Sequence, residues 1–365
     1  MLPTEASLMN RNEQYPSIIE PHEPILITGA AGFIGYAVVE SLLRRGFLNL
    51  RCFTRSFAGG AKLKALSARY PDAAIEIVQG NLLSREDCIA AANGAAVVIH
   101  LAAGRGEKLV PDAYLNSVVT TRNLLEACIK QQGVRRFVNV SSFTVYTNCG
   151  KQSWRTLDES CPVENHPELR GDAYTFAKVK QDEIVERYGQ QYGIPCVLVR
   201  PGFVYGPGGK AALTGRVGTG AFGLFLHLGG STKIPLSYLD NCADAIALTA
   251  VVPGIDGEVF NVVDGGLPSS RKFLRLYKKN VKRFKSIYVP KPVSFLLCYV
   301  WERYSNWSEG QLPLAFNRKS WHAFWKTTRY SNEKLRKRLG WSQCVPTEEG
   351  MRRYFEACRT GGVNA

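Results

Sequence analysis

The sequence lacks the patterns of disulfide-bonded, zinc-binding and membrane-spanning proteins. Its ten cysteines are scattered singly without a CxxC pair, and its five histidines show no metal-ligand spacing. No apolar run reaches the roughly 18 residues that a membrane-spanning helix needs. Residues 1–24 are polar and contain no apolar core of the kind found in signal peptides. We therefore expect reduced thiols, no metal site and a cytoplasmic location.

Acidic residues are scarce in the last quarter of the chain. Residues 271–365 hold 21 Lys/Arg and 6 Asp/Glu and carry the whole net charge of +15, whereas residues 1–270 hold 25 of each. A solvated basic face is one explanation, and contact of residues 271–341 with an anionic membrane surface, or with an anionic substrate, is the other. No nucleic-acid recognition motif accompanies the charge, so we expect no nucleic-acid partner.

An amphipathic helix is predicted over 292–304, within this basic quarter. Pro292 suits a first helical turn, and one stripe collects Val293, Leu296, Leu297, Val300, Trp301 and Tyr304. Such a helix can cap a substrate-binding lobe, or it can face lipid or an apolar substrate.

Short apolar runs alternate with helical patterns from residue 24 onward. The runs are 25–28, 50–54, 75–79, 96–101, 137–141, 195–199 and 259–262, and the helical patterns lie near 33–45, 60–69, 85–92, 112–132 and 173–192. This alternation predicts an α/β fold built on a doubly wound parallel sheet. We expect a flexible lead over 1–23, a dinucleotide-binding domain over 24–200 completed by the strand near 259–262, and a smaller substrate-binding lobe from 201–258 and 263–355. The glycine-rich stretch 206–223 is predicted to be a linker or a substrate-covering loop.

The most informative stretch is TGAAGFIG, residues 28–35. It follows an apolar strand and opens a helical pattern, as a dinucleotide site requires. Gly29 permits the tight turn, Gly32 lets the backbone approach a pyrophosphate, and Gly35 lets the helix pack on its strand. The N–H groups of the new helix then face the phosphates.

An acid/base pair is suggested by YTFAK, because Tyr174 and Lys178 share one face of the predicted helix. A nearby ammonium favours the phenolate and lowers the pKa of a tyrosine. Ser142 follows a buried strand, where a hydroxyl can bind a substrate oxygen.

These residues resemble the short-chain dehydrogenase/reductase superfamily, in its extended branch of the NAD-dependent epimerase/dehydratase type. The resemblance covers roughly residues 24–355, with further matches in GNLL (80–83), VIHLAA (98–103), NSVVTTRNLLEAC (116–128), RPGFVYGPG (200–208), IPLSYLDNCADA (234–245), GEVFNVVDGG (257–266) and SNEKLRKRLGW (331–341). It implies a Rossmann-type fold, Tyr174 as proton donor/acceptor, Lys178 on the nicotinamide ribose and Ser142 on the reacting oxygen. It implies a cofactor site formed by Thr28, Gly29, Gly32, Phe33, Ile34, Gly35, Arg55, Asn81, Leu82, Leu101, Ala102, Ala103, Tyr174, Lys178 and Pro201. Homodimers are frequent in this family, through helices that here correspond to 112–132 and 173–192.

The cofactor type depends on the end of the second strand. Relatives that prefer NAD place a carboxylate there, whereas this chain has Thr54, Arg55 and Ser56. Arg55 can pair with a 2′-phosphate, so we expect NADP(H), with NAD(H) as the alternative.

Two departures from the family pattern bear on the substrate. Phe143 and Thr144 stand where dehydratases carry Asp-Glu, which disfavours dehydration, and Phe203 replaces the Asn of many sugar-nucleotide epimerases. The favoured function is hydride transfer at a hydroxyl or keto carbon of a nucleotide sugar or related sugar. The alternatives are a 3β-hydroxysteroid dehydrogenase-like oxidoreductase, which the aromatic tail resembles, and a non-catalytic dinucleotide sensor.

Overall fold

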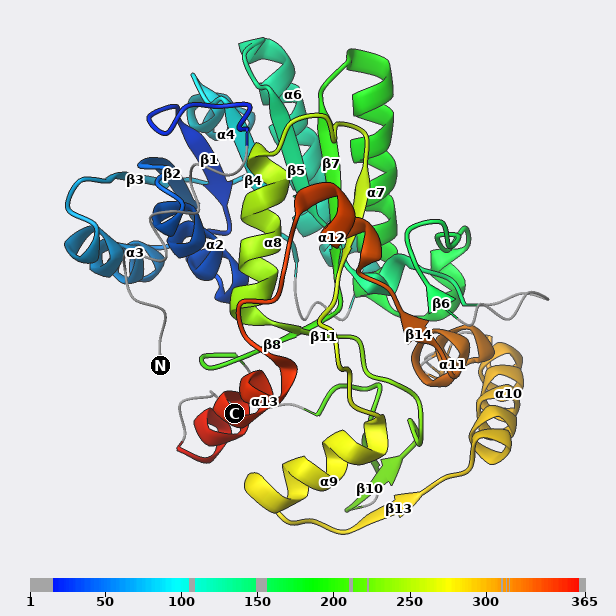
Figure 1. Cartoon of the computed structure of the whole chain (residues 1–365). Coiled ribbons are helices and arrows are strands. Elements are labelled where there is room, and N and C mark those ends of the chain that lie inside the picture. Colours follow the sequence, from blue (N-terminus) through cyan, green and yellow to red (C-terminus); the bar gives the residue numbers. More distant parts are fainter. Residues whose placement is uncertain are drawn as a thin grey trace.

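The centre of the protein is a seven-stranded parallel sheet, seen in a computed structural model that describes residues 16–104, 109–148, 156–209, 213–221, 223–309, 311–312, 314 and 316–360 (Figure 1). The order is β12 (Val259–Val262), β7 (Cys196–Pro201), β5 (Arg136–Val140), β4 (Val97–His100), β1 (Ile25–Thr28), β2 (Asn49–Thr54) and β3 (Ala74–Gln79). Every neighbouring pair is parallel. Each predicted apolar run forms one of these strands, so the predicted α/β fold is confirmed.

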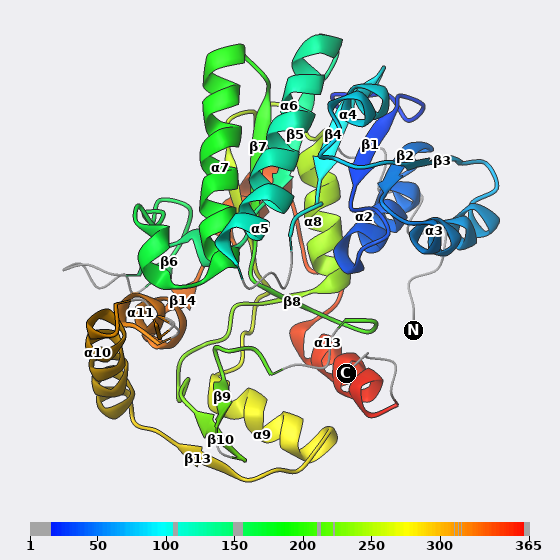
Figure 2. The same cartoon turned by 180° about the vertical axis from the view of Figure 1, so that it is seen from behind.

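Helices cover both faces of the sheet, because side chains alternate between the faces along each strand. Ile25 and Ile27 of β1 enter one apolar cluster with α2 (Phe33–Arg44), α3 (Phe57–Arg69) and α8 (Leu239–Val251). Leu26 enters a second cluster with α4 (Arg85–Ala92), α6 (Thr120–Gln131) and α7 (Ala173–Tyr192). Figure 2 shows α6 and α7 in front of the strands and α8 behind them.

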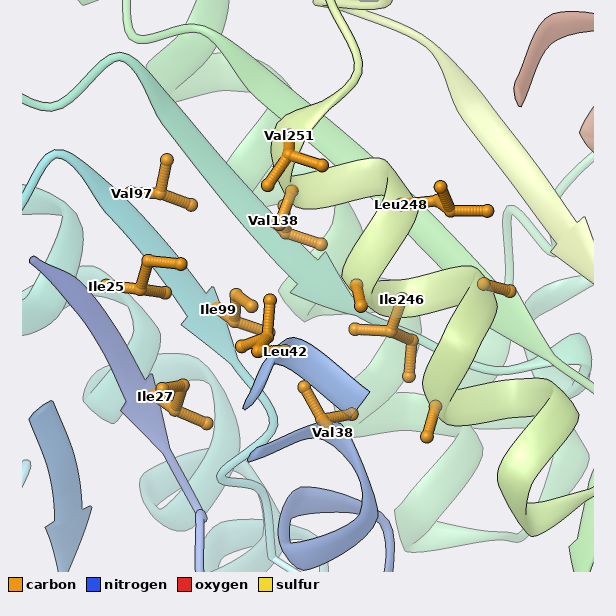
Figure 3. Close-up of a cluster of buried hydrophobic side chains, with 14 of the residues drawn as sticks. Ile25, Ile27, Val38, Leu42, Val97, Ile99, Val138, Ile246, Leu248 and Val251 are labelled. Atoms are coloured by element: carbon orange, nitrogen blue, oxygen red, sulfur yellow. The ribbon is translucent and has the colours of Figure 1, made fainter. Parts of the chain in front are cut away.

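Helix α8 belongs to the core of the sheet, although the sequence assigned its segment to the substrate-binding lobe. Its alanines are fully buried, and its Ile246, Leu248 and Val251 lie among Val38 and Leu42 of α2 and the side chains of β1, β4 and β5 (Figure 3). Small alanine side chains allow the two helices to approach closely, and α12 (Glu333–Leu339) adds two leucines to the same cluster. Residues 239–251 therefore pack with the sheet domain.

A flexible lead is predicted over 1–23, of which the structure describes residues 16–23. Ile19 is 3% exposed within the apolar cluster of α2 and α8. The Ile18 N–H donates to the carbonyl of Val251, and Arg135 forms an ion pair with Glu23. Burial and these polar contacts fix residues 17–23 on the sheet domain.

The helix predicted over 112–132 is divided into three parts. These are α5 (Val110–Tyr114), a π-helical turn (Leu115–Val119) and α6. In the wider π turn, the Ser117 carbonyl accepts from the hydroxyls of Thr120 and Thr121. Such turns inside helices are often found at functional sites.

The smaller lobe lies below the sheet in Figure 1. One apolar cluster joins β8 (Phe203–Tyr205), β11 (Leu236–Tyr238), α9 (Ser270–Asn280) and α13 (Thr347–Arg359), and another joins α10 (Lys291–Trp307) to α11 (Arg318–Trp325). The remaining strands are β6 (Thr156–Leu157), β9 (Gly218–Ala221), β10 (Leu224–His227), β13 (Ser286–Tyr288) and β14 (Arg329–Tyr330), and short 3-10 turns span Phe143–Val145 and Pro167–Arg170.

The glycine-rich stretch 206–223 is not a simple loop. Residues 218–221 form β9, antiparallel to β10, while residues 210–212 and 222 lie outside the description. A Cβ on Gly218 would lie 1.9 Å from the Leu226 carbonyl oxygen, so this pairing requires glycine.

Candidate active site

The turn after β1 has the shape of a phosphate cradle. Gly29 has φ +70, and a Cβ on it would lie 2.9 Å from the Ala102 nitrogen. A Cβ on Gly32 would lie 3.0 Å, and one on Gly35 only 2.1 Å, from the Gly29 carbonyl oxygen. No side chain caps the N–H groups of the first turn of α2. A pyrophosphate fits this turn, because backbone donors and the positive end of the helix meet where side chains are excluded.

The residues after β4 join this turn. The Leu101 N–H donates to the Thr28 carbonyl at 3.2 Å, and the Ala102 N–H donates to the Thr28 hydroxyl at 3.4 Å. Leu101, Ala102 and Ala103 are half-buried, and the N–H of the next residue donates to the Ser117 hydroxyl at 3.0 Å. The π turn therefore holds the segment that faces the glycine turn.

Other predicted cofactor residues border the same edge of the sheet. Phe33 is half-buried against the segment after β8, since a Cβ on Gly209 would lie 2.9 Å from the Phe33 ring. Ile34 packs against the apolar cluster of α2 and α8, and Pro201 is the buried last residue of β7.

Three further predicted cofactor residues follow β2 and β3, and they differ in exposure. Asn81 is exposed and its side-chain oxygen accepts from the Leu83 N–H at 3.0 Å, whereas Leu82 is only 5% exposed within the core. The Leu82 side chain thus serves packing, and its backbone carbonyl accepts from the Asn123 side-chain amide at 3.0 Å. Arg55 is exposed between β2 and α3, and forms no ion pair within the described ranges.

The predicted acid/base residues sit at the start of α7. The Asp172 carboxylate caps this helix by accepting from the N–H groups of Tyr174 and Thr175. Tyr174 is half-buried, and Lys178 is one turn further along. Ser142 is half-buried two residues after β5, and its hydroxyl accepts from the Thr144 N–H at 3.2 Å. A hydrogen bond between the hydroxyls of Thr144 and Thr175 joins the Ser142 turn to α7.

Lys178 is buried and held by two acceptors. Its Nζ donates to the Val140 carbonyl at 2.8 Å and to Gln181 Oε1 at 2.7 Å. Burial lowers the pKa of Lys178 to about 8, while the nearby Asp182 carboxylate acts in the opposite direction. An ammonium has three donors, so one remains for a ligand. Lys178 is therefore poised to be charged near neutral pH and to lose its charge just above it.

A buried chain of hydrogen bonds continues from Lys178 to the glycine turn. Gln181 Nε2 donates to the Thr121 hydroxyl at 2.7 Å, and that hydroxyl donates to the Ser117 carbonyl at 2.6 Å. His100 lies next, with Nε2 at 2.9 Å from the Thr121 hydroxyl and Nδ1 at 2.7 Å from the Thr28 hydroxyl.

The directions of these bonds assign the proton on His100. Because the Thr121 hydroxyl donates its proton to the Ser117 carbonyl, His100 Nε2 must donate to the Thr121 oxygen. His100 Nδ1 must then accept from the Thr28 hydroxyl. Burial lowers the pKa of His100 to about 3, so the ring is neutral, as this assignment requires. The chain thus joins α7, α6, β4 and β1.

The sequence predicted Lys178 and Thr28, the two ends of this chain of hydrogen bonds, as site residues. It did not predict Gln181, Thr121 or His100 as the residues between them. Gln181 lies three residues after Lys178, which is a helical spacing, and this was the only sequence signal. Thr121 and His100 belong to other segments that meet Gln181 only in the folded protein.

A buried ion pair holds the middle of α7. Arg200 and Asp182 approach to 3.1 Å with both side chains 3% exposed. The Arg200 guanidinium lies 4.8 Å from the centre of the Tyr146 ring, and the Tyr146 hydroxyl donates to Asn261 at 2.8 Å. This pair ties α7 to β7 behind the predicted active site.

The sequence is similar to those of known enzymes. The sequence model of the NAD dependent epimerase/dehydratase family matches residues 25–262. A trifunctional UDP-glucose 4,6-dehydratase/UDP-4-keto-6-deoxy-D-glucose 3,5-epimerase/UDP-4-keto-L-rhamnose-reductase of Arabidopsis thaliana is 26% identical over 91% of this chain, which spans 46% of that protein. A 3beta-hydroxysteroid-dehydrogenase/decarboxylase of the same plant is 23% identical, over 93% of this chain and 80% of that protein.

Solved structures share the fold. A UDP-glucuronic acid 4-epimerase from Bacillus cereus, in complex with UDP-glucuronic acid and NAD, superposes with a TM-score of 0.69 at 19% identity, over 92% of this chain and 99% of that one. A dTDP-glucose 4,6-dehydratase from Streptomyces venezuelae with NAD bound gives a TM-score of 0.69 at 20% identity, over 93% and 99% of the two chains. With the family sequence model matching well over half of its length, this chain belongs to the NAD-dependent epimerase/dehydratase family and is an NAD(P)-dependent enzyme of the short-chain dehydrogenase/reductase type.

Proposed function

We propose that the protein transfers hydride at a hydroxyl or keto carbon of a nucleotide sugar or related sugar, with Ser142, Tyr174 and Lys178 as its catalytic residues. The observation that carries this proposal is the position of Lys178, buried one helical turn from Tyr174 and held with one donor to spare. A nicotinamide dinucleotide, when bound along the glycine turn, supplies the hydride chemistry.

Each residue has a role that follows from its surroundings. The Lys178 ammonium favours the Tyr174 phenolate, so that this tyrosine exchanges a proton with the substrate oxygen near neutral pH. The Ser142 hydroxyl, at the carboxyl edge of the sheet, orients that oxygen. The backbone N–H groups of the glycine turn bind the pyrophosphate.

The nucleotide-sugar substrate is supported by the family and by the activities named for several relatives. Phe143 is 3% exposed and packs in an apolar cluster with Val145 and Tyr146, so no carboxylate enters the position that dehydratases use. We therefore favour epimerisation or keto-reduction over dehydration.

The test is Tyr174→Phe, assayed against a panel of UDP- and dTDP-sugars by product NMR. We expect turnover to fall by about 10²- to 10⁴-fold, which is the usual contribution of a positioned acid/base. Tyr192→Phe, at the exposed end of the same helix, is the control and should keep full turnover. Unchanged turnover in Tyr174→Phe would refute the assignment.

Native mass spectrometry of the purified enzyme separates the two reactions. An epimerase regenerates its dinucleotide within each cycle and gains by retaining it, whereas a reductase must release it. Close to one retained dinucleotide per chain supports epimerisation. An empty protein that fills only when NADPH is added supports reduction.

The preference for NADP(H) is a finer part of the proposal. It is supported by Arg55, exposed and without an ion pair among the described residues, and by the lack of a carboxylate at 53–56. Arg55→Ala should weaken NADPH binding far more than NADH binding in fluorescence titrations, and Arg336→Ala on α12 should change neither. Equal losses for both dinucleotides would refute the preference. The solved relatives named above hold NAD.

A hydrophobic alcohol or ketone is the second candidate substrate. It is favoured by Phe203, which lies half-buried against the apolar cluster of the lobe, and by the hydroxysteroid dehydrogenase relative that matches 93% of the chain. Turnover of sterols with none on the sugar panel would select it.

A homodimer is also proposed, through α5, the π turn and α7. Large apolar side chains are exposed there, among them Leu109, Val110, Tyr114 and Leu115 at 63, 41, 42 and 44%. Light scattering after size exclusion should give twice the mass of the 40.4 kDa chain.

A further inference from the structure

Helix α10 presents a continuous apolar stripe to solvent. At about 100° per residue, six side chains fall within roughly 100° of arc around the helix. They are Val293, Leu296, Leu297, Val300, Tyr304 and Trp307, exposed by 46, 59, 57, 55, 51 and 77%. Exposed leucines are common singly on soluble proteins, but an aligned set over the length of a helix marks a contact surface.

The opposite face of α10 packs on the protein with small side chains. Ser294, Cys298 and Ser305 are buried, and the Trp321 indole N–H donates to the Ser294 hydroxyl at 2.9 Å. An ion pair between Glu302 and Arg318 at 2.9 Å also fixes α10 against α11. The sequence left open whether the apolar stripe caps the lobe or faces outward. It faces outward, except that the predicted member Trp301 is half-buried and Trp307 extends the stripe instead.

Positive charge is concentrated on the elements that directly precede this stripe in the chain. Residues 271–301 contain nine Lys/Arg and no Asp/Glu. Lys282, Arg283 and Lys285 are exposed just before β13, which itself exposes Ile287 and Tyr288 by 53 and 43%. Both views place α9, β13 and α10 along the outer border of the lobe, on the side away from the seven-stranded sheet (Figures 1 and 2).

We propose that α10 lies in the interface of an anionic lipid bilayer, with this stripe in the acyl boundary and the basic side chains that precede it on the headgroups. A bilayer satisfies both properties of the surface at once, since interfacial helices combine an apolar face with lysine and arginine beside it. Tyr304 and Trp307 stack with ring centres 5.8 Å apart, and such amphipathic rings are favoured at headgroup level.

A second copy of the chain is a poorer occupant. A two-fold contact through α10 would bring the same basic surface against itself, and like charges across an interface are repulsive.

An orientation of α10 along the bilayer surface also fits this helix better than insertion across the bilayer. Its apolar stripe is about 21 Å long at 1.5 Å per residue, and in the part of the chain that the structure describes no helix is long and apolar enough to cross a membrane.

The test is co-sedimentation of the full chain with vesicles of phosphatidylcholine containing about one third phosphatidylglycerol. We expect binding at low salt, weaker binding to pure phosphatidylcholine, and partial release at 1 M salt because screening shortens the reach of the charges. Leu296→Gln should weaken binding about tenfold or more, because a leucine loses its apolar burial. Leu169→Gln, a leucine 49% exposed on the 3-10 turn Pro167–Arg170, is the matched control and should bind like the wild type.

Folding of each variant is checked by NADPH binding, which α10 does not contact in this proposal. No sedimentation of the wild type at low salt would overturn the proposal. Binding that salt abolishes and Leu296→Gln leaves unchanged would also overturn it, because the stripe would then play no part. Self-association that Leu296→Gln abolishes, without vesicle binding, would assign the stripe to a second copy. Since vesicle binding needs no substrate, its outcome is separate from that of the proposed function.

Discussion

Gln181 should set the pH range over which the enzyme binds its dinucleotide. The side chain is fully buried and offers Oε1 to the Lys178 ammonium at 2.7 Å. Lys178 is proposed to bind the nicotinamide ribose as an ammonium, so affinity should be high below the Lys178 pKa of about 8 and should fall above it. Replacing Gln181 by leucine removes one of the two acceptors that stabilise this buried charge.

The size of the effect follows from that lost acceptor. A hydrogen bond to a charged group contributes about 1.5–3 kcal/mol, and 1.36 kcal/mol corresponds to one pKa unit. Gln181→Leu should therefore lower the Lys178 pKa by about 1–2 units, to between about 6 and 7. At the middle of that range, about 6.5, the charged fraction at pH 7.5 would fall from about three quarters to about one tenth, and affinity by roughly eightfold.

The assay is the dissociation constant of NADPH, measured by tryptophan fluorescence from pH 5.5 to 9.5. The bend in the plot of affinity against pH should move down in Gln181→Leu and up in Gln181→Glu, because a carboxylate stabilises the ammonium further. Gln191→Leu, exposed on the same helix, is the control. A wild-type affinity that does not vary across this pH range would refute the reasoning. A bend that moves in the same direction in Gln181→Leu and in Gln181→Glu would also refute it.

Two further predictions concern stability and the phosphate turn. Gly35→Ala places a methyl group 2.1 Å from the Gly29 carbonyl oxygen, so α2 must move. We expect the free energy of unfolding in urea to fall by about 1–3 kcal/mol and NADPH binding to weaken. NADPH affinity equal to that of the wild type would contradict the proposed cradle. Asp182→Ala leaves Arg200 buried without its partner and should cost about 3–5 kcal/mol. Glu183→Ala breaks only the exposed pair with Lys180 and should cost less than about 1 kcal/mol, so similar losses in the two variants would contradict this reading.

The seven strands of the sheet were predictable because each has a local apolar run. The glycine turn was equally clear, since Gly29, Gly32 and Gly35 lie within seven consecutive residues. What escaped prediction depends on contacts between distant segments. The hydrogen-bond chain from Lys178 to Thr28 draws on four separate elements, and no local pattern marks Thr121 or His100 as its members.

Two other features that the sequence did not reveal have the same origin. Residues 17–23 were expected to be a loose lead, yet they are held by Val251 and Arg135, which are more than a hundred residues away. From the sequence, residues 239–251 belong to the substrate-binding lobe, and only the folded protein shows that the alanines of α8 pack in one cluster with α2.

The position of α8 has a consequence for dissecting this protein into pieces. The sheet takes β12 and α8 from beyond residue 200, and a fragment ending there would expose the apolar face of α2 and the open edge of β7 to water. Such fragments aggregate, because unpaired strand edges and apolar faces associate with other chains. Expression of the lobe alone meets the same obstacle, since its chain passes through the sheet domain twice. No single cut in the sequence therefore separates the sheet domain from the lobe, because α8, β12 and α12 return to the sheet domain from within the lobe's part of the chain.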